Sequence, residues 1–255
     1  SLNKKFLNFS NKNVDLLRIN MSHIEINHLE NLIKYIKKYS KTPICIDTEG
    51  AQIRTKVKKK KFYKLNSKIN ILKYKGNFSL YPPEVYEKIK INDTLNVGFS
   101  GLKIKIKKRN HKFISANVTQ AGFLEKNKGV HITNRKLKLN YLTHKDFLAI
   151  NLGKKLKIKN YALSFTNNFK DIIKFNKLLK TENKIFKLET NSALKDLQNI
   201  FKFGKNFLID RGDLSQDISI EQIPIAQRKI TKIGKRKGKN IFVATNFLES
   251  MLINN

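Results

Sequence analysis

Two short apolar runs in the second half of the chain each end in charged residues. The run K-I-F-K-L-E-T contains Lys187 and Glu189, and the run N-F-L-I-D-R-G-D-L leads to Arg211 and Asp213. Two carboxylates can share one hard cation such as Mg²⁺, which prefers oxygen ligands. The lysine and the arginine can hold the anion that such a cation binds. These residue types indicate metal-assisted chemistry on an anion; the alternative is that the charges only cap strands at the surface.

The spacing of the apolar residues predicts the elements that would position these charges. Between the two runs, Leu194, Leu197, Ile200 and Phe203 recur at helical spacing. A strand–helix–strand unit of this kind has parallel strands, and the active sites of parallel α/β folds lie at the carboxyl ends of the strands. The four charged side chains are therefore expected at one edge of a sheet.

A second unit of the same type lies near the start of the chain. One strand leads into R-I-N-M-S-H, which begins at Arg18, and residues 25–39 form an amphipathic helix. The next strand, P-I-C-I-D-T, ends in Asp47 and Thr48. The order strand–helix–strand again predicts parallel strands, with polar residues where each strand ends.

The pattern changes between Lys56 and Ile132, where alternation replaces helical spacing. The segment L-K-I-K-I-K, from Leu102 to Lys107, alternates with a period of two, and shorter runs are separated by Gly and Asn turns. This pattern predicts a small all-β insertion at residues 56–132. The α/β domain is then built from residues 1–55 and 133–255.

The rest of the chain supplies further helices and strands of the α/β domain. The segment 142–165 is predicted as a helix followed by a strand, and residues 221–235 as another helix. The last predicted strand ends at Ala244 and presents Thr245. The six predicted strands of this domain are Val14–Ile19, Pro43–Asp47, Tyr161–Ser164, Lys184–Glu189, Phe207–Asp210 and Ile241–Ala244.

Several ordered motifs resemble those of the pyruvate kinase family. K-L-E-T resembles the family's K-I-E-N, D-R-G-D-L resembles A-R-G-D-L, and V-A-T-N-F-L-E-S-M resembles A-T-Q-M-L-E-S-M. In the first half, R-I-N-M-S-H resembles R-L-N-F-S-H-G, and D-T-E-G-A-Q-I-R-T resembles D-T-K-G-P-E-I-R-T. The segment A-G-F-L-E-K-N-K-G-V-H-I resembles the exit of the family's lid, G-G-x-L-G-x-x-K-G-V-N-L. The resemblance implies an α/β fold, a TIM (β/α)₈-type barrel with an inserted small β-barrel lid domain.

The resemblance also implies a function and its residues. The family moves a phosphoryl group from phosphoenolpyruvate to ADP, which gives pyruvate and ATP in glycolysis. Catalytic roles are implied for Lys187, Arg18 and Thr245. Substrate contacts are implied for Arg18, Lys187, Arg211, Gly212, Asp213 and Thr245, and nucleotide contacts for Asn20, His23, Arg54 and Lys128. The implied metals are Mg²⁺ at Glu189 and Asp213, and K⁺ at Asn20, Ser22, Asp47 and Thr48. A homo-oligomer, a tetramer in the family, is implied as well.

The sequence departs from the family pattern at several positions. The lid motif D-D-G is here G-F-S-G, and the alanine of A-R-G-D-L is Asp210. The glutamate usual in K⁺-dependent members is Gln52, which leaves K⁺ dependence open. The family's first barrel strand would precede Ser1, and its eighth strand and C-terminal domain would follow Asn255. The chain is therefore expected to be either a trimmed portion of a longer protein or a shortened relative.

Three alternatives stand beside the phosphotransferase. A catalytically weakened relative that binds a phosphometabolite as a sensor or scaffold is favoured by the lost lid acids. A related barrel with aldol or carboxyl chemistry is disfavoured by the lid insertion. A nucleic-acid-binding protein would fit the net charge of +34. Lys, Asn and Ile are abundant together, however, which indicates a compositional bias rather than the arginines and aromatics of a nucleic-acid surface.

The cysteine content and hydropathy indicate a compartment. Cys45 is the single cysteine, so a disulfide framework is impossible and a reducing cytoplasm is expected. No signal peptide is visible, and no apolar run approaches the roughly 20 residues that span a membrane. No membrane partner is therefore expected, and the composition described above argues against a nucleic-acid partner as well.

Overall fold

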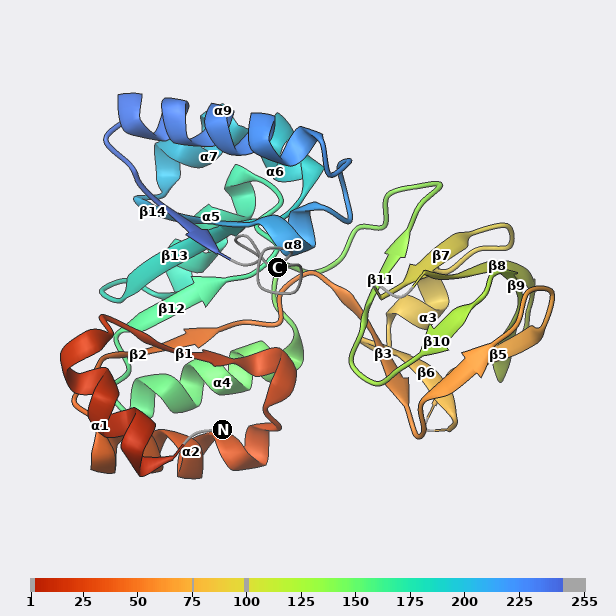
Figure 1. Cartoon of the computed structure of the whole chain (residues 1–255), viewed down its shortest axis with the longest axis horizontal. Helices are drawn as coiled ribbons and strands as arrows, with labels where there is room; N and C mark the ends of the chain where they lie inside the picture. Colours follow the sequence, from red (N-terminus) through yellow and green to blue (C-terminus); the bar gives the residue numbers. More distant parts are fainter. Residues whose placement is uncertain (1–2, 75, 99–100, 245–255) are drawn as a thin grey trace, which may run out of the picture. The chain divides into compact units, whose positions relative to one another are not determined.

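The computed structural model describes residues 3–74, 76–98 and 101–244, and it divides the chain into two compact units (Figure 1). We call Ser1–Ala51 together with Tyr141–Asn255 the barrel unit, and Gln52–Asn140 the lid unit. The sequence predicts these borders at 55/56 and 132/133. The difference arises because Ile53–Val57 forms a strand that pairs within the lid unit. Across the described residues, no helix is both long and apolar enough to cross a membrane.

The barrel unit is built on a curled sheet of six strands, a partial TIM barrel, in which each neighbouring pair is parallel. The strand order is β1-β2-β12-β13-β14-β15. The bounds are β1 Leu17–Asn20, β2 Ile44–Asp47, β12 Asn160–Leu163, β13 Asn183–Leu188, β14 Asn206–Asp210 and β15 Asn240–Ala244. The predicted α/β fold class and each of the six predicted strands are confirmed.

Helices connect these strands and pack on the sheet. The bounds are α1 Lys4–Asn13, α2 Ile26–Tyr39, α4 His144–Lys155, α5 Phe169–Leu178, α6 Asn191–Lys195, α7 Leu197–Phe203, α8 Arg211–Leu214 and α9 Gln222–Arg236, with a short 3₁₀ turn η1 at Met21–His23. The single helix predicted between Glu189 and Phe207 is in fact two, α6 and α7. The break falls at Asp196, whose carboxylate accepts hydrogen bonds from the Phe169 N–H and the Asn199 amide.

The core of the barrel unit lies between the sheet and its helices. Phe175, Phe186, Phe201 and Phe207 are each at most 1% exposed and form one continuous group of ring contacts. Where helices approach the sheet most closely, the helix residue is glycine. A Cβ on Gly153 of α4 would lie 2.6 Å from Ile46 Cδ1, and one on Gly234 of α9 would lie 2.6 Å from Ile241 Cγ1.

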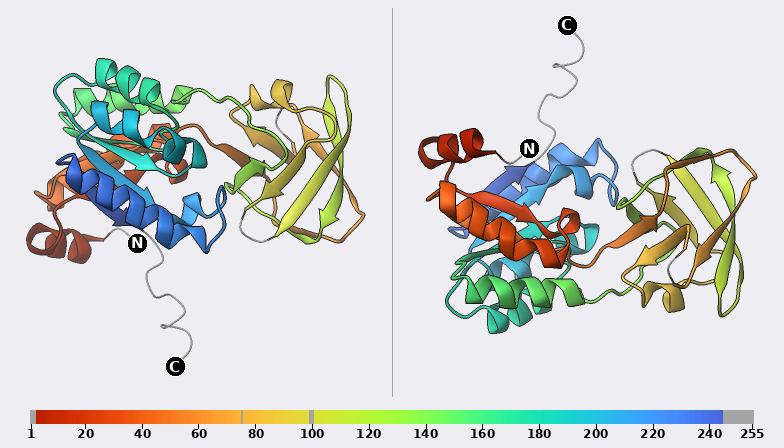
Figure 2. Two further views of the ribbon diagram at one scale, coloured as in Figure 1. Left: turned by 90° about the horizontal axis from the view of Figure 1, so that it is seen from above. Right: turned by 90° about the horizontal axis from the view of Figure 1, so that it is seen from below.

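The lid unit is a closed, mostly antiparallel β-barrel with the strand order β11-β3-β6-β5-β9-β8-β7 (Figure 2). The bounds are β3 Ile53–Val57, β5 Lys68–Leu72, β6 Phe78–Tyr81, β7 Thr94–Val97, β8 Leu102–Arg109, β9 Phe113–Gln120 and β11 Gly129–Ile132. A separate pair, β4 Lys61–Tyr63 with β10 Gly122–Leu124, and the helix α3 Val85–Lys88 complete the unit. In β8, Leu102, Ile104 and Ile106 are fully buried while the lysines between them are not. The predicted alternation is the pattern of a strand that faces the barrel core on one side.

Candidate active site

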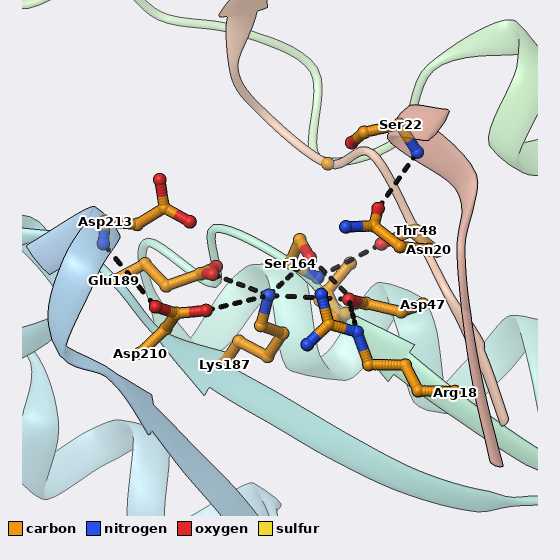
Figure 3. Close-up of polar contacts among 12 residues, drawn as sticks. Arg18, Asn20, Ser22, Asp47, Thr48, Ser164, Lys187, Glu189, Asp210 and Asp213 are labelled. Carbon is orange, nitrogen blue, oxygen red and sulfur yellow. Dashed lines mark hydrogen bonds and ion pairs between the residues drawn. The ribbon is translucent and has the colours of Figure 1, made fainter. Parts of the chain in front are cut away.

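Four strands of the barrel unit, β1, β2, β13 and β14, contribute charged side chains to one edge of the sheet. Figure 3 shows Arg18, Asp47 and Lys187 near one another; Asp47 is the last residue of β2, Lys187 is next to last in β13, and Arg18 lies two residues before the end of β1. Glu189 directly follows β13, and Asp210 is the last residue of β14. Parallel pairing places these residues at one edge, because Asn20 pairs with Asp47 and Leu188 with Ile209.

Lys187 lies at the centre of this group and is only 4% exposed. Its Nζ is 2.7 Å from Glu189 Oε1 and 3.5 Å from a carboxylate oxygen of both Asp47 and Asp210. Its Nζ also donates a hydrogen bond to Ser164 Oγ at 3.2 Å. Burial by itself lowers the pKa of the ammonium, but the surrounding carboxylates outweigh that effect and raise the pKa above its usual range. Lys187 therefore carries a fixed positive charge.

For Glu189, by contrast, the effect of burial on the pKa outweighs the effect of the neighbouring positive charge. The side chain is 1% exposed, and its Oε2 accepts a hydrogen bond from the Phe165 N–H at 2.5 Å. Burial raises the pKa of this carboxyl group to about 7; the charges of Asp213 and Asp210 add to the rise, and Lys187 opposes it. One carboxylate oxygen from each of Glu189, Asp210 and Asp213 lies within 4.8 Å of the other two. Oxygen donors at this separation suit a hard divalent cation.

Asp47 is the second acidic centre of the edge. Its Oδ2 contacts Arg18 Nε at 3.0 Å, and its Oδ1 accepts a hydrogen bond from Ser164 Oγ at 2.8 Å. Thr48 Oγ1 accepts from the Ser164 N–H at 3.0 Å. On the neighbouring strand, Asn20 Oδ1 accepts from the Ser22 N–H at 3.0 Å. Ser164 thus holds Asp47, Thr48 and Lys187 in one network.

Two residues in the first turn of α4, Lys145 and Asp146, hold the loop that follows β2. Asp146 accepts hydrogen bonds from the N–H groups of Glu49 at 2.7 Å and Gly50 at 3.1 Å, while Lys145 Nζ lies 3.0 Å from Glu49 Oε1. Gly50 has φ of +66°, and a Cβ there would overlap the carbonyl oxygen of Ser164. The backbone of this loop therefore requires glycine at its closest approach to the site.

Comparison with known proteins identifies the family. The model of the pyruvate kinase barrel domain matches residues 3–255. The chain is 31% identical to the pyruvate kinase of Thermotoga maritima, 29% to that of Clostridium perfringens and 29% to that of Methanocaldococcus jannaschii. These alignments cover 94%, 93% and 94% of the chain and 55%, 54% and 54% of the respective relatives.

The chain belongs to the pyruvate kinase family. It spans about half the length of the curated relatives that it matches. Membership in the family explains why the motifs lie where the strands of the sheet end.

The structure brings most of the predicted pyruvate kinase residues of the barrel unit to one edge. These residues are Arg18, Asn20, Ser22, Asp47, Thr48, Lys187, Glu189 and Asp213. His23 ends the turn η1, and Arg211, Gly212 and Asp213 form the start of α8. Arg54 and Lys128 belong to the lid unit, where Arg54 Nη1 donates to Asn127 O and the Lys128 N–H donates to Thr55 Oγ1. Thr245 lies outside the described residues.

Two residues of the edge are missing from the predicted set. Ser164 follows β12 and contacts Asp47, Thr48 and Lys187; its segment A-L-S-F resembles the family's A-S-F, but no role is predicted for the serine. Asp210 stands out in the sequence only as an acid in place of the family's alanine, yet it is 5% exposed and contacts Lys187. A rule that takes every polar residue at a strand end would have included both.

Proposed function

We propose that the protein transfers a phosphoryl group from phosphoenolpyruvate to ADP, forming pyruvate and ATP. The observation that carries the proposal is the buried ammonium of Lys187 among acidic strand ends, in a chain of the pyruvate kinase family. In the proposed reaction, the bond between the enol oxygen and phosphorus breaks, and a β-phosphate oxygen of ADP bonds to the phosphorus. The enolate that is left takes up a proton to become pyruvate.

Lys187 and Arg18 are proposed to hold the transferring group. Stabilisation of charge on the phosphoryl oxygens is the main catalytic contribution in phosphoryl transfer. Lys187 stays charged because its pKa is raised, and Ser164 fixes the direction of its ammonium. Arg18 contacts Asp47 through Nε, and its side chain is 41% exposed, so its guanidinium can meet a phosphate as a fork.

The chain's acids are proposed to hold the metals. Glu189 and Asp213 would bind Mg²⁺, which supplies Lewis-acid polarisation of the enolpyruvate oxygens when bound. Their oxygens lie close enough for one cation. Asn20, Ser22, Asp47 and Thr48 offer amide, hydroxyl and carboxylate oxygens at adjacent strand ends, which suits K⁺. Gln52 leaves dependence on K⁺ an open prediction.

The remaining assignments extend the proposal. Arg211 and Gly212 are proposed to bind the substrate carboxylate, and Thr245 to orient the substrate. Asn20 and His23 of the barrel unit are proposed nucleotide contacts, and Arg54 and Lys128 of the lid unit are separate proposals of the same kind. A homo-oligomer and a cytoplasmic location remain predictions of the same kind.

A sensor or scaffold that binds a phosphometabolite without turnover is the second candidate. One specific observation favours it: Lys187 faces the carboxylates of Asp47, Glu189 and Asp210, so its charge is shared before any substrate phosphate arrives. Both candidates need the same binding groups. They differ only in whether bound phosphoenolpyruvate is converted to pyruvate.

The test is a direct assay of the purified protein. With Mg²⁺, K⁺, ADP and phosphoenolpyruvate, pyruvate should form and can be followed through coupling to lactate dehydrogenase. Omitting ADP is the control, because phosphoryl transfer requires the acceptor. Binding of phosphoenolpyruvate without pyruvate formation in a folded protein would replace the phosphotransferase with the sensor.

A further inference from the structure

We propose that Asp210 is a third carboxylate ligand of the divalent-cation site formed by Glu189 and Asp213. The inference rests on the proposed function insofar as that function places a divalent cation at Glu189 and Asp213. It goes further by giving this chain a metal ligand at a position where the family motif A-R-G-D-L has alanine. The first argument is one of position. Asp210 ends β14 directly beside the end of β13, and the pairing of Leu188 with Ile209 brings Glu189 and Asp210 next to each other.

The distances suit one shared cation. The chosen carboxylate oxygens of Glu189, Asp210 and Asp213 all lie within 4.8 Å of one another. Two oxygens on opposite sides of one Mg²⁺ are about 4.2 Å apart, and two on opposite sides of a larger cation about 5 Å apart. Adjacent oxygens on one octahedral ion are about 3 Å apart, so the three acids can converge on one ion with shifts of about 1 Å or less. Figure 3 shows Asp210 and Glu189 directed toward the same region beside Lys187.

The burial and charge of the group point to an additional cation. Glu189 is 1% exposed, and its Oε1 accepts no hydrogen bond within the described part of the chain; its contact there is the ion pair with Lys187. Asp210 is also buried, at 5% exposure, and its contact with Lys187 is long, at 3.5 Å. Burying carboxylates is unfavourable unless their charge is balanced. The ammonium of Lys187 is shared with Asp47 as well, and a divalent ion would place further positive charge beside the three acids.

Two other roles for Asp210 must be separated from metal binding. Its Oδ1 accepts the Asp213 N–H at 3.5 Å, so it could serve only to begin α8. It could also serve only as a counter-ion of Lys187. Asparagine keeps a side-chain oxygen and so preserves the first role, but its neutral amide is a weaker ligand for a divalent ion than a carboxylate is. The second role changes the local field but adds no ligand to the ion.

The experiment measures Mn²⁺ binding to the protein without phosphoenolpyruvate or ADP. Isothermal titration gives the affinity, and the water-proton relaxation of bound Mn²⁺ gives the number of water molecules on the ion. Asp210→Asn and Asp210→Ala should both weaken Mn²⁺ binding by about tenfold or more, since even partners outside the ligand shell often contribute 10–100-fold. Asp210→Ala should also gain about one metal-bound water, because it leaves no side-chain oxygen in place of the lost carboxylate.

The control is Asp217→Asn, which changes an exposed acid that accepts the Asn191 N–H and lies outside the acidic group. It should leave Mn²⁺ affinity and hydration unchanged, and circular dichroism verifies the fold of each variant. Parent-like Mn²⁺ affinity in Asp210→Asn would overturn the inference, as would weaker binding without a gain of water in Asp210→Ala. Because these measurements use no substrate, they separate this inference from the proposed function. If the parent forms pyruvate and Asp210→Asn binds Mn²⁺ as the parent does, only the inference about Asp210 is refuted.

Discussion

The barrel unit and the lid unit bury different kinds of side chains. Among the described residues, the barrel unit buries six charged side chains, namely Asp47, Glu49, Asp146, Lys187, Glu189 and Asp210, whereas the lid unit buries only Asp93. A parallel sheet brings the carboxyl ends of all its strands to the same edge, where polar groups can face one another. A closed antiparallel barrel directs alternate side chains into one apolar core. The barrel unit therefore buries a group of charges at and near the ends of its strands, whereas the lid unit keeps most of its charges on its surface.

The largest effect is expected from the buried charge at the centre of the barrel unit. Lys187→Met removes the ammonium and keeps the side-chain length. If Lys187 stabilises the transition state, kcat should fall about 10²–10³-fold while KM for phosphoenolpyruvate changes far less. Steady-state kinetics measures both values.

The matched control is Lys184→Met on the same strand, because Lys184 Nζ donates to the Leu179 carbonyl and not to the acidic group. This variant should keep the kcat of the parent. Equal turnover in Lys187→Met and the parent would show that Lys187 is not the catalytic lysine.

The lid unit should respond most strongly to loss of apolar packing. Ile104 is fully buried in β8, so Ile104→Ala should lower the free energy of unfolding by about 2–5 kcal/mol. Chemical denaturation measures the loss, and hydrogen exchange should place it within residues 52–140. Lys107→Ala, on the exposed side of the same strand, is the control and should change stability by no more than about 0.5 kcal/mol. Similar losses in the two variants would contradict the apolar core assigned to this unit.

A buried acid of the barrel unit should make stability depend on pH. Burial raises the pKa of Asp146 to about 6 from its usual value of 3.8. A raised pKa in the folded state means that this contribution to stability is full below about pH 4 and is lost as the pH rises through about 6. The loss is on the order of 3 kcal/mol.

Asp146→Asn removes the titrating group, so the difference in unfolding free energy between parent and variant should change across this pH range. Denaturation at a series of pH values measures it. Asp217→Asn serves as the control, since its exposed side chain should leave the pH profile of the parent intact. A pH profile that Asp146→Asn leaves unchanged would show that Asp146 does not titrate in this range.

The smallest effect is expected from a surface ion pair of the lid unit. Lys60 Nζ lies 2.5 Å from Glu125 Oε1, but the Lys60 side chain is 59% exposed. Lys60→Ala should therefore change the free energy of unfolding by less than about 1 kcal/mol, as thermal or chemical denaturation can show. Arg135→Met, which deprives the buried Asp93 of its guanidinium, should cost clearly more. A larger loss of stability in Lys60→Ala than in Arg135→Met would contradict the distinction between surface and buried ion pairs in this unit.

Much of the barrel unit could be predicted from sequence because its strands are short apolar runs that end in chemistry-bearing residues. The runs that lead to Asp47, Glu189 and Asp210 form strands whose bounds lie within one residue of the predicted ones. The alternation in Leu102–Lys107 likewise predicts a strand of the lid unit. These patterns are local, so a single sequence carries them.

The contacts between distant segments could not be predicted in the same way. Ser164 joins Asp47, Thr48 and Lys187 only because the strands fold side by side, and no local pattern records that register. The end of α6 at Asp196 depends on the Phe169 N–H from another connection. The border at Gln52 depends on pairing of β3 with β6 and β11, which the run of residues 53–57 does not reveal by itself.

The close helix–sheet contacts at Gly153 and Gly234 limit how this protein can be engineered. Replacing a glycine inside a helix with alanine is a common way to stabilise a protein, worth up to about 1 kcal/mol, because it restricts the unfolded chain. At these two positions the added methyl group would collide with Ile46 and Ile241, both on strands of the sheet. A thermostabilised variant should therefore keep both glycines and take its helix-stabilising substitutions from exposed helix positions.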